Sequence, residues 1–291
     1  MLSDNVMSQL GELNRRRAAG MGAAETVRAI ASLPRMVDAE SASEPVDQLP
    51  AGSESVTVAG KHWVRRVPVI GLWPGVDKCL RDWPDIQRVP GAEPPKRCAE
   101  LESLLRWFPR STAFLDLETC GFAGSMVFLI GVIHHDHEQL VLTQLLARHY
   151  GEEKSILHGL CDILADQRVL VTFNGKSFDW PMVVDRLTLH RIEDRVIELS
   201  TAWVHCDLLH HARRRWRRKL PDCKLQTLER YLCGRRRVDD IAGREIPEAY
   251  HDFVRSGDAW LVRRVLHHNA LDLVTLIQLA RGLVVPAAER S

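Results

Sequence analysis

Apolar and polar positions follow a regular pattern from residue 111 onward and predict alternating strands and helices. Apolar runs of strand length cover residues 112–118, 126–134, 139–146, 168–173 and 204–209. Apolar residues at helical spacing cover 152–165, 177–189, 225–232, 247–256 and 258–283. Three strands in hairpin order, followed by alternating helices and strands, predict an α/β fold with a mixed five-stranded sheet flanked by helices.

The first 107 residues are less regular. Residues 1–36 predict one or two amphipathic helices, and residues 37–55 are acidic and rich in Ser, Pro and Ala, which is typical of a flexible linker. A short hairpin is expected over 56–69, then a mostly irregular proline-containing stretch, and a helix over 98–107. We therefore expect an N-terminal extension over 1–107, a folded domain over 108–285 and a tail over 286–291.

The composition is that of a globular protein, with 45% hydrophobic and 26% charged residues. No apolar run reaches the roughly 18 residues of a membrane span, and the first residues lack the pattern of a signal peptide. The seven cysteines include no CxxC pair, so neither a disulfide framework nor a zinc ribbon is indicated. We expect a cytoplasmic protein that does not associate with membranes.

Charge is unevenly distributed, although the formal net charge is only +1. Residues 38–54 are acidic, whereas 213–219 and 235–237 are dense positive clusters. Such asymmetry favours a polyanionic partner. A solvated basic surface accounts equally well for the two positive runs taken alone.

Two carboxylates, Asp116 and Glu118, lie at the end of the apolar strand predicted over 112–118. Side chains alternate along a strand, so both carboxylates should emerge on one face while Leu117 points to the other. Like charges this close repel, and one would hold a proton unless a cation neutralised them. Oxygen ligands of this kind suit hard divalent ions such as Mg²⁺ or Mn²⁺.

A second polar motif follows the fourth predicted strand, where Asn174 and Gly175 precede Asp179. Gly175 permits a tight turn, and Asp179 begins the helix predicted over 177–189. Taken alone, Asp179 is better explained as a helix N-cap, and Asn174 as a turn residue.

A third motif lies in the last predicted helix, where Asp272 falls close to the apolar stripe. A carboxylate in that position needs a partner. His268 is four residues earlier and shares its face, whereas His267 would share that face only if the helix began late. A lone histidine there is usually a satisfied core residue, so its role depends on the acids of the other two motifs.

Together these motifs resemble the DEDD superfamily of 3′-to-5′ exonucleases, which have an RNase H-like fold. Its motifs are D-x-E, here 116–118, N-x-x-x-F/Y-D, here 174–179, and an aspartate that follows a histidine by five residues or a tyrosine by four. The chain is most similar to the YprB-type branch of RNase H-like proteins over residues 108–285, with supporting runs at 128–132, 206–210 and 268–272. That branch tends to carry tyrosine where His268 stands.

The resemblance implies a two-metal-ion mechanism, in which two divalent cations, Mg²⁺ or Mn²⁺, act on a phosphodiester. The implied ligands are Asp116, Glu118, Asp179 and Asp272, with Asp116 bridging the ions. Either His267 or His268 would accept the proton of the attacking water. The residues expected to contact substrate are Thr119, Cys120, Gly121, Asn174, and the basic run with Arg213, Arg214, Arg215 and Trp216, whose indole could stack on a base.

The predicted function is therefore a metal-dependent 3′-to-5′ exonuclease that acts on single-stranded DNA or RNA. A structure-selective endonuclease on the same fold is one alternative. A catalytically silent nucleic-acid-binding module is another, and the presence of all four acids disfavours it.

Overall fold

The computed structural model describes residues 47–83, 98–121, 124–200 and 203–284. The helices predicted within 1–36, most of the linker predicted over 37–55, and the tail predicted over 286–291 lie outside the described residues. Within the described residues, no helix combines the length and apolar character needed to cross a membrane.

The described strands form one mixed sheet of seven strands in the order β1-β2-β5-β4-β3-β6-β7. The strands are β1 (Ser53–Thr57), β2 (Gly60–Pro68), β3 (Thr112–Thr119), β4 (Val127–Asp136), β5 (Gln139–Leu146), β6 (Val169–Thr172) and β7 (Val204–Asp207). Pairing is antiparallel from β1 to β3 and parallel from β3 to β7. The mixed sheet was predicted correctly, but the predicted number of five strands is wrong.

The two additional strands come from the N-terminal hairpin. Strand β2 pairs antiparallel with β5 over six residues, and Trp63 and Val64 of β2 are buried. Because β5 would otherwise present an unpaired edge, the hairpin extends the sheet rather than standing apart from it. Strand β1 begins at Ser53, so the end of the predicted linker is part of the hairpin.

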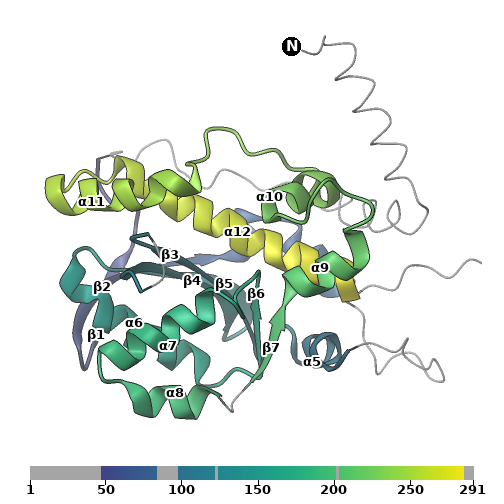
Figure 1. Cartoon of the computed structure of the whole chain (residues 1–291), viewed down its shortest axis with the longest axis horizontal. Coiled ribbons are helices and arrows are strands. Elements are labelled where there is room, and N and C mark those ends of the chain that lie inside the picture. Colours follow the sequence, from purple (N-terminus) through teal and green to yellow (C-terminus); the bar gives the residue numbers. More distant parts are fainter. Residues whose placement is uncertain (1–46, 84–97, 122–123, 201–202, 285–291) are drawn as a thin grey trace, which may run out of the picture.

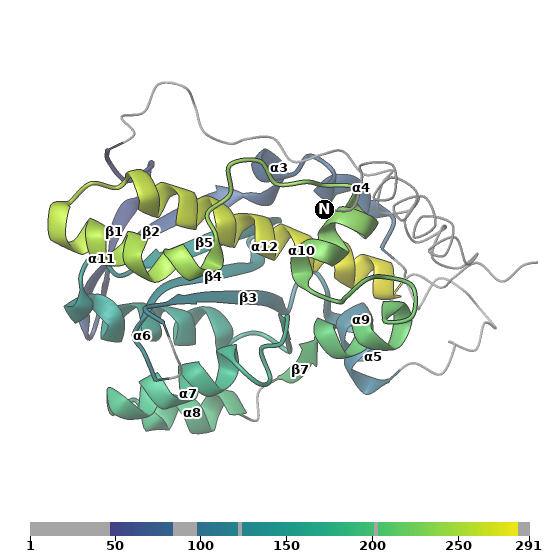
Figure 2. The same cartoon turned by 45° about the horizontal axis from the view of Figure 1, so that its top comes forward.

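Helices cover both faces of the sheet (Figures 1 and 2). The helices are α3 (Val69–Leu72), α4 (Val76–Arg81), α5 (Ala99–Trp107), α6 (Glu153–Leu164), α7 (Asp179–Leu189), α8 (Glu193–Ser200), α9 (Leu208–Trp216), α10 (Leu225–Leu228), α11 (Ile246–Ser256) and α12 (Trp260–Val284). Helices α6, α7 and α8 lie on one face, while α12 crosses the other with α9, α10 and α11 beside it. Short turns are η2 (Tyr150–Glu152), the π-helical η3 (Glu229–Cys233) and η4 (Gly243–Glu245).

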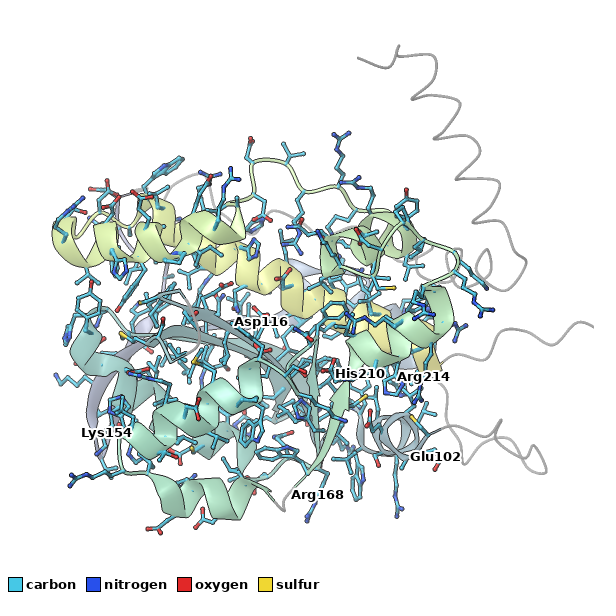
Figure 3. All side chains as sticks on the ribbon, in the orientation of Figure 1. Glu102, Asp116, Lys154, Arg168, His210 and Arg214 are labelled. Atoms are coloured by element: carbon cyan, nitrogen blue, oxygen red, sulfur yellow. The ribbon has the colours of Figure 1, made fainter. Side chains whose placement is uncertain are left out.

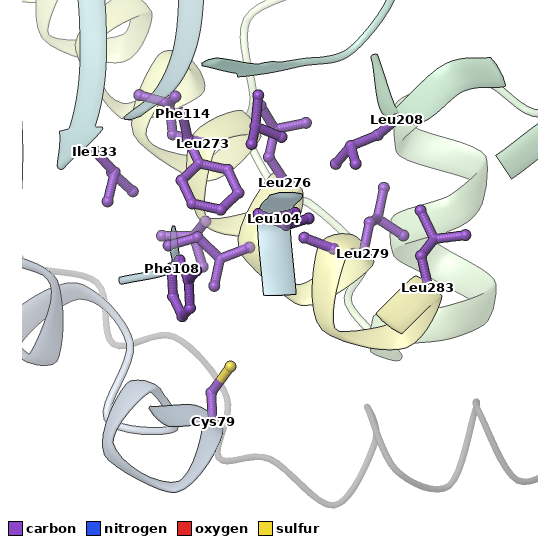
Figure 4. Close-up of a cluster of buried hydrophobic side chains, with 14 of the residues drawn as sticks. Cys79, Leu104, Phe108, Phe114, Ile133, Leu208, Leu273, Leu276, Leu279 and Leu283 are labelled. Atoms are coloured by element: carbon purple, nitrogen blue, oxygen red, sulfur yellow. The ribbon is translucent and has the colours of Figure 1, made fainter. Parts of the chain in front are cut away.

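Alternation along β3 assigns its side chains to the two faces. Phe114 belongs to the core under α12, whereas Leu115 and Leu117 belong to the core under α6 and α7. Figure 4 shows part of the first core, where Leu273 and Leu276 of α12 pack near Phe114. The predicted alternation is confirmed, and it directs the acidic positions of β3 toward α12.

The sequence pattern missed several short helices. Residues 69–81 form α3 and α4, although prolines predicted an irregular stretch. The fifth strand ends at Asp207 rather than 209, because the Asp207 carboxylate accepts from the Leu209 N–H and caps α9. Helix α8 was not predicted either.

Candidate active site

Asp116 and Glu118 of β3, Asp179 of α7 and Asp272 of α12 lie close enough to interact electrostatically. Burial and the negative charges of Asp272 and Asp179 raise the pKa of Asp116 well above its usual range. Burial and the charges of Asp116, Asp272 and Asp179 likewise raise the pKa of Glu118. Figure 3 shows Asp116 near the centre of the molecule, beneath α12. Four acids from three distant segments of the sequence therefore share one electrostatic environment.

The end of β3 presents the first two acids. Asp116 pairs with Gly131 of β4 and Glu118 with Leu129, and both acidic side chains are half-buried. The pairing shifts register between Glu118 and Thr119, where the strand leaves the regular ladder. Such an irregularity bends a strand locally and re-aims its side chains.

Asp179 is the first residue of α7 and is buried. The N-cap of α7 is Phe178, and it makes no side-chain capping bond. The interpretation of Asp179 as a helix cap is therefore wrong. Burial raises the pKa of Asp179 to about 7, with contributions from the charges of Asp207 and Asp272, while hydrogen bonding to the backbone of Leu117 opposes the rise.

The turn that precedes α7 is held by a buried acid on β7. Asp207 accepts hydrogen bonds from the backbone N–H groups of Asn174 at 2.8 Å and Lys176 at 3.2 Å. Asn174 has a φ of 67°, and a Cβ on Gly175 would lie 2.4 Å from the Thr172 side chain. Asp207 is thus a structural acid that shapes the 174–179 motif, and the Asn174 side chain is left exposed.

Asp272 on α12 is paired with a buried guanidinium. Arg237 donates to Asp272, to Asp240 at 3.1 Å and to Glu229 at 2.8 Å. Its side chain is only 7% exposed. Although burial disfavours the charged form, Asp272 and Glu229 raise the pKa of Arg237 above its usual range. Part of the basic run at 235–237 therefore points inward to the acids instead of toward solvent.

Two histidines were candidates for the general base, and the fold gives them different surroundings. The Nδ1 atom of His268 lies 2.9 Å from both carboxylate oxygens of Asp240, and its Nε2 lies 3.5 Å from Asp272 Oδ2. Burial lowers the pKa of His268, but the Asp240 hydrogen bond and the Asp272 charge raise it on balance. His267 is half-buried and lies about 100° further around the helix. Asp240 was not predicted as a site residue, because it does not belong to a recognisable sequence motif.

The predicted substrate contacts fall into two groups. Thr119, Cys120 and Gly121 directly follow Glu118 and are half-buried, and the Thr119 hydroxyl donates to the Gly121 carbonyl at 3.0 Å. On α9, Arg213 and Arg214 are exposed. Figure 3 places Arg214 on α9, an element that packs against α12.

Arg215 and Trp216 differ from these exposed neighbours. Arg215 is half-buried and donates to the Leu283 carbonyl at 3.4 Å. Trp216 is fully buried in the core that Figure 4 shows in part. The predicted stacking of Trp216 on a base is wrong, because the helical period turns its indole into the core while Arg213 and Arg214 face solvent.

A second group of ligand-type side chains lies between α5 and α9. One ligand atom each of Cys98, Glu100 and His211 lies within 4.8 Å of the others. His211 Nε2 bonds Glu100 at 2.7 Å, its Nδ1 lies 3.8 Å from the Cys98 sulfur, and Lys176 pairs with Glu100 at 2.6 Å. The two ring nitrogens face different partners, so this group is satisfied as a hydrogen-bond network that ties the 174–179 turn to α5 and α9.

Comparison with known proteins agrees with this fold. A family model of the RNase H superfamily matches residues 113–284, more than half of the chain, and the chain belongs to that superfamily. The fold is thus of a nuclease type, and RNase H-like nucleases use divalent metals.

Within the superfamily, the predicted YprB-type family is confirmed. The chain is 38% identical over 169 residues to uncharacterized protein YprB of Bacillus subtilis (strain 168), covering 57% of this chain. It spans 40% of that relative's length. A family B DNA polymerase from Pyrobaculum calidifontis matches at 16% identity with a TM-score of 0.45, covering 59% of this chain and 24% of the polymerase.

Proposed function

We propose that this protein is a metal-dependent nuclease that hydrolyses phosphodiester bonds, working as a 3′-to-5′ exonuclease on single-stranded DNA or RNA. The observation that supports this most directly is that Asp116, Glu118, Asp179 and Asp272 come together in one electrostatic cluster on an RNase H-like fold. Burial and the negative charges of the neighbouring acids raise the pKa of Asp116 and Glu118, and a bound cation would relieve both effects.

The donor set fits hard divalent cations. All four side chains offer oxygen atoms, so Mg²⁺ or Mn²⁺ would be preferred over softer metals. Asp116, Glu118, Asp179 and Asp272 would hold two such ions. When bound, the ions would lower the pKa of a water and stabilise the charge that develops on the phosphodiester.

The chain itself supplies the proton acceptor. We assign this role to His268. Its Nδ1 is hydrogen-bonded to Asp240, so its Nε2, which faces Asp272, is the atom that can accept a proton. A histidine oriented by a carboxylate keeps one tautomer and accepts a proton at a defined atom. Asp240 is a positioning residue in this scheme.

Substrate would approach along two surfaces. Residues 119–121 directly follow Glu118, and Asn174 lies in the turn before Asp179, so we expect both to contact the terminal nucleotide. The exposed Arg213 and Arg214 would attract phosphates, and Arg215 lies beside them on α9.

The test is an end-labelled degradation assay with single-stranded and duplex DNA and RNA in Mg²⁺, Mn²⁺ or chelator. The wild type should shorten single strands one nucleotide at a time from the 3′ end, and Asp116→Asn or Asp272→Asn should abolish this activity with the fold intact. Asp252→Asn, which changes a carboxylate on α11 whose side chain is 41% exposed, is the matched control and should keep full activity.

The alternatives give different results in the same assay. Discrete internal fragments would identify an endonuclease, and binding without cleavage would identify a silent module. Full activity in both Asp116→Asn and Asp272→Asn would refute the proposed site.

A further inference from the structure

Three paired residues on neighbouring strands, Asp116 of β3, Gly131 of β4 and Gln144 of β5, lie side by side in the sheet. Gly131 of β4 pairs with Asp116 of β3 on one side and with Gln144 of β5 on the other. Because Gly131 has no side chain, it leaves a gap between the two polar neighbours. The side chain of Asn269 from α12 fills that gap, since a Cβ on Gly131 would lie 2.0 Å from Asn269 Oδ1.

Asn269 connects the two neighbours by hydrogen bonds of defined direction. Its Nδ2 donates to Asp116 Oδ2 at 2.8 Å and to the Asp116 carbonyl at 3.3 Å. Its Oδ1 accepts from Gln144 Nε2 at 3.0 Å, and the same Nε2 donates to the Leu266 carbonyl at 2.7 Å. Asn269 and Gln144 are fully buried, so neither amide exchanges these partners for water.

The direction of these hydrogen bonds is set by Arg65 in the β1–β2 hairpin. Arg65 on β2 donates to Gln144 Oε1 at 3.4 Å, which leaves the Gln144 amide nitrogen for Asn269. An amide that accepts at its oxygen must turn its nitrogen to the opposite side. Asn269 therefore presents a donor, and not an acceptor, to Asp116.

We propose that Asn269 is a positioning residue for Asp116 that holds carboxylate atom Oδ2 and leaves Oδ1 to bind a divalent cation. The inference rests on the proposed function, because it takes Asp116 as a ligand. A neutral donor suits this place: it favours the charged carboxylate without competing with the cation as a fixed positive charge would. Gly131 is required as the space that admits Asn269, and Gln144 sets the orientation of the Asn269 amide.

The experiment measures Mn²⁺ binding to the full chain by electron paramagnetic resonance, without substrate. Asn269→Leu removes the donor at similar volume and should weaken Mn²⁺ binding at least tenfold, within the range typical of lost outer-shell partners. Gln144→Leu leaves Asn269 in place but unoriented, and it should weaken binding by a smaller factor. The Mn²⁺ concentration for half-maximal cleavage should rise in the same order.

Two further variants keep the test decisive. Gly131→Ala displaces Asn269 without changing it, and should reproduce the loss if Asn269→Leu fails to fold. Thr275→Val is the matched control: it removes a buried polar group of α12 that bonds Arg235 and the Leu271 carbonyl, so it should leave Mn²⁺ affinity unchanged.

The outcomes separate this inference from the proposed function. If the wild type binds no Mn²⁺, the proposed metal site is wrong. If the wild type binds Mn²⁺, and folded Asn269→Leu and Gly131→Ala bind it within twofold as tightly, the acid site stands and the role of Asn269 is refuted.

Discussion

Three acids of the cluster, Asp116, Asp179 and Asp272, have hydrogen-bond partners of different kinds. Asp116 receives a neutral amide donor from Asn269, Asp179 is bonded to backbone, and Asp272 is paired with the guanidinium of Arg237. A buried carboxylate needs such a partner, and the kind of partner decides how readily it stays charged. Identical chemical groups thus acquire different properties within one site.

The two adjacent histidines, His267 and His268, should also contribute differently to cleavage. Replacing His268 with Asn should lower the cleavage rate at saturating Mn²⁺ about a hundredfold or more, the usual size of a general-base contribution. His267→Asn should cause only a small loss, because the position lies on another side of the helix. Steady-state rates of the purified variants check this expectation, with thermal unfolding as the control for folding.

A double-mutant cycle tests whether Asp240 acts through His268. Asp240→Asn alone should slow cleavage, whereas adding it to His268→Asn should cost little more, because the interaction it serves is already gone. Strictly additive losses would show that Asp240 acts independently. Equal and trivial losses in the two histidine variants would mean that neither is the base.

At the scale of elements, α9 shows how one helix serves both the core and the surface. Leu208, Ala212 and Trp216 are buried at helical spacing, while Arg213 and Arg214 face solvent. The residues of this basic run are therefore divided between the core and the surface. Only the exposed arginines, such as Arg213 and Arg214, are available to a polyanion.

Neutralising that exposed surface should weaken nucleic-acid binding in a salt-dependent way. If Arg213 and Arg214 each contact one phosphate, the double variant to Gln should reduce the slope of log affinity against log salt by about 1.4 for a single strand. Fluorescence anisotropy with a labelled oligonucleotide measures the slope. Arg255→Gln on α11, which changes another exposed arginine, is the control, and a slope unchanged in the α9 variant would exclude this surface.

Strand β7 carries a histidine whose protonation opposes folding. Burial, aided by the charge of Lys176, lowers the pKa of His205 to about 4, and its Nε2 lies 2.9 Å from the Thr172 hydroxyl. The unfolded chain binds this proton near pH 6.5, so the contribution of neutral His205 to stability is complete above that pH and is lost as the pH falls toward 4.

Substituting His205 with Gln should therefore change the pH dependence of unfolding. The difference in unfolding free energy between wild type and His205→Gln should shift in favour of the variant by up to about 3 kcal/mol between pH 7 and pH 4. Urea titrations at several pH values provide the measurement. A difference that stays constant with pH would contradict the shifted pKa.

For the whole molecule, the hairpin and the helices after it are integrated with the sheet. Strand β2 pairs with β5, and Trp73, Val76 and Cys79 from the next helices join the core under α12. Arg65 further links this region to the acid cluster through Gln144. Structural support for the site thus begins before residue 113, where the family match starts.

Removing this region should destabilise the remainder. A chain that begins at residue 108 should lose at least about 3 kcal/mol of unfolding free energy, or fail to fold, because several large apolar side chains lose their burial and β5 loses its partner. A chain that begins at residue 47 keeps every described element and is the matched control. Equal melting temperatures for the two chains would show that residues 108–285 are sufficient.

Much of the fold followed from local periodicity. The predicted 139–146 strand coincides with β5, and the predicted strands at 112–118 and 126–134 differ from β3 and β4 by no more than two residues at either end. The alternation that directs Asp116 and Glu118 to one face was also visible in the sequence. Local pattern identifies such features because strand and helix periods repeat every two and 3.6 residues.

The sequence by itself determined the mixed α/β class, the family, and the four acids as a set, since each acid lies in a motif of a few residues. Only the tertiary structure decided that Asn269 enters the space over Gly131, that Asp240 orients His268, that Trp216 is buried, and that the hairpin extends the sheet. These features join residues from 28 to 153 positions apart in the chain or depend on which helix face meets the core. Short-range periodicity encodes the face of each element but not its partner, and the partner is fixed when the elements pack.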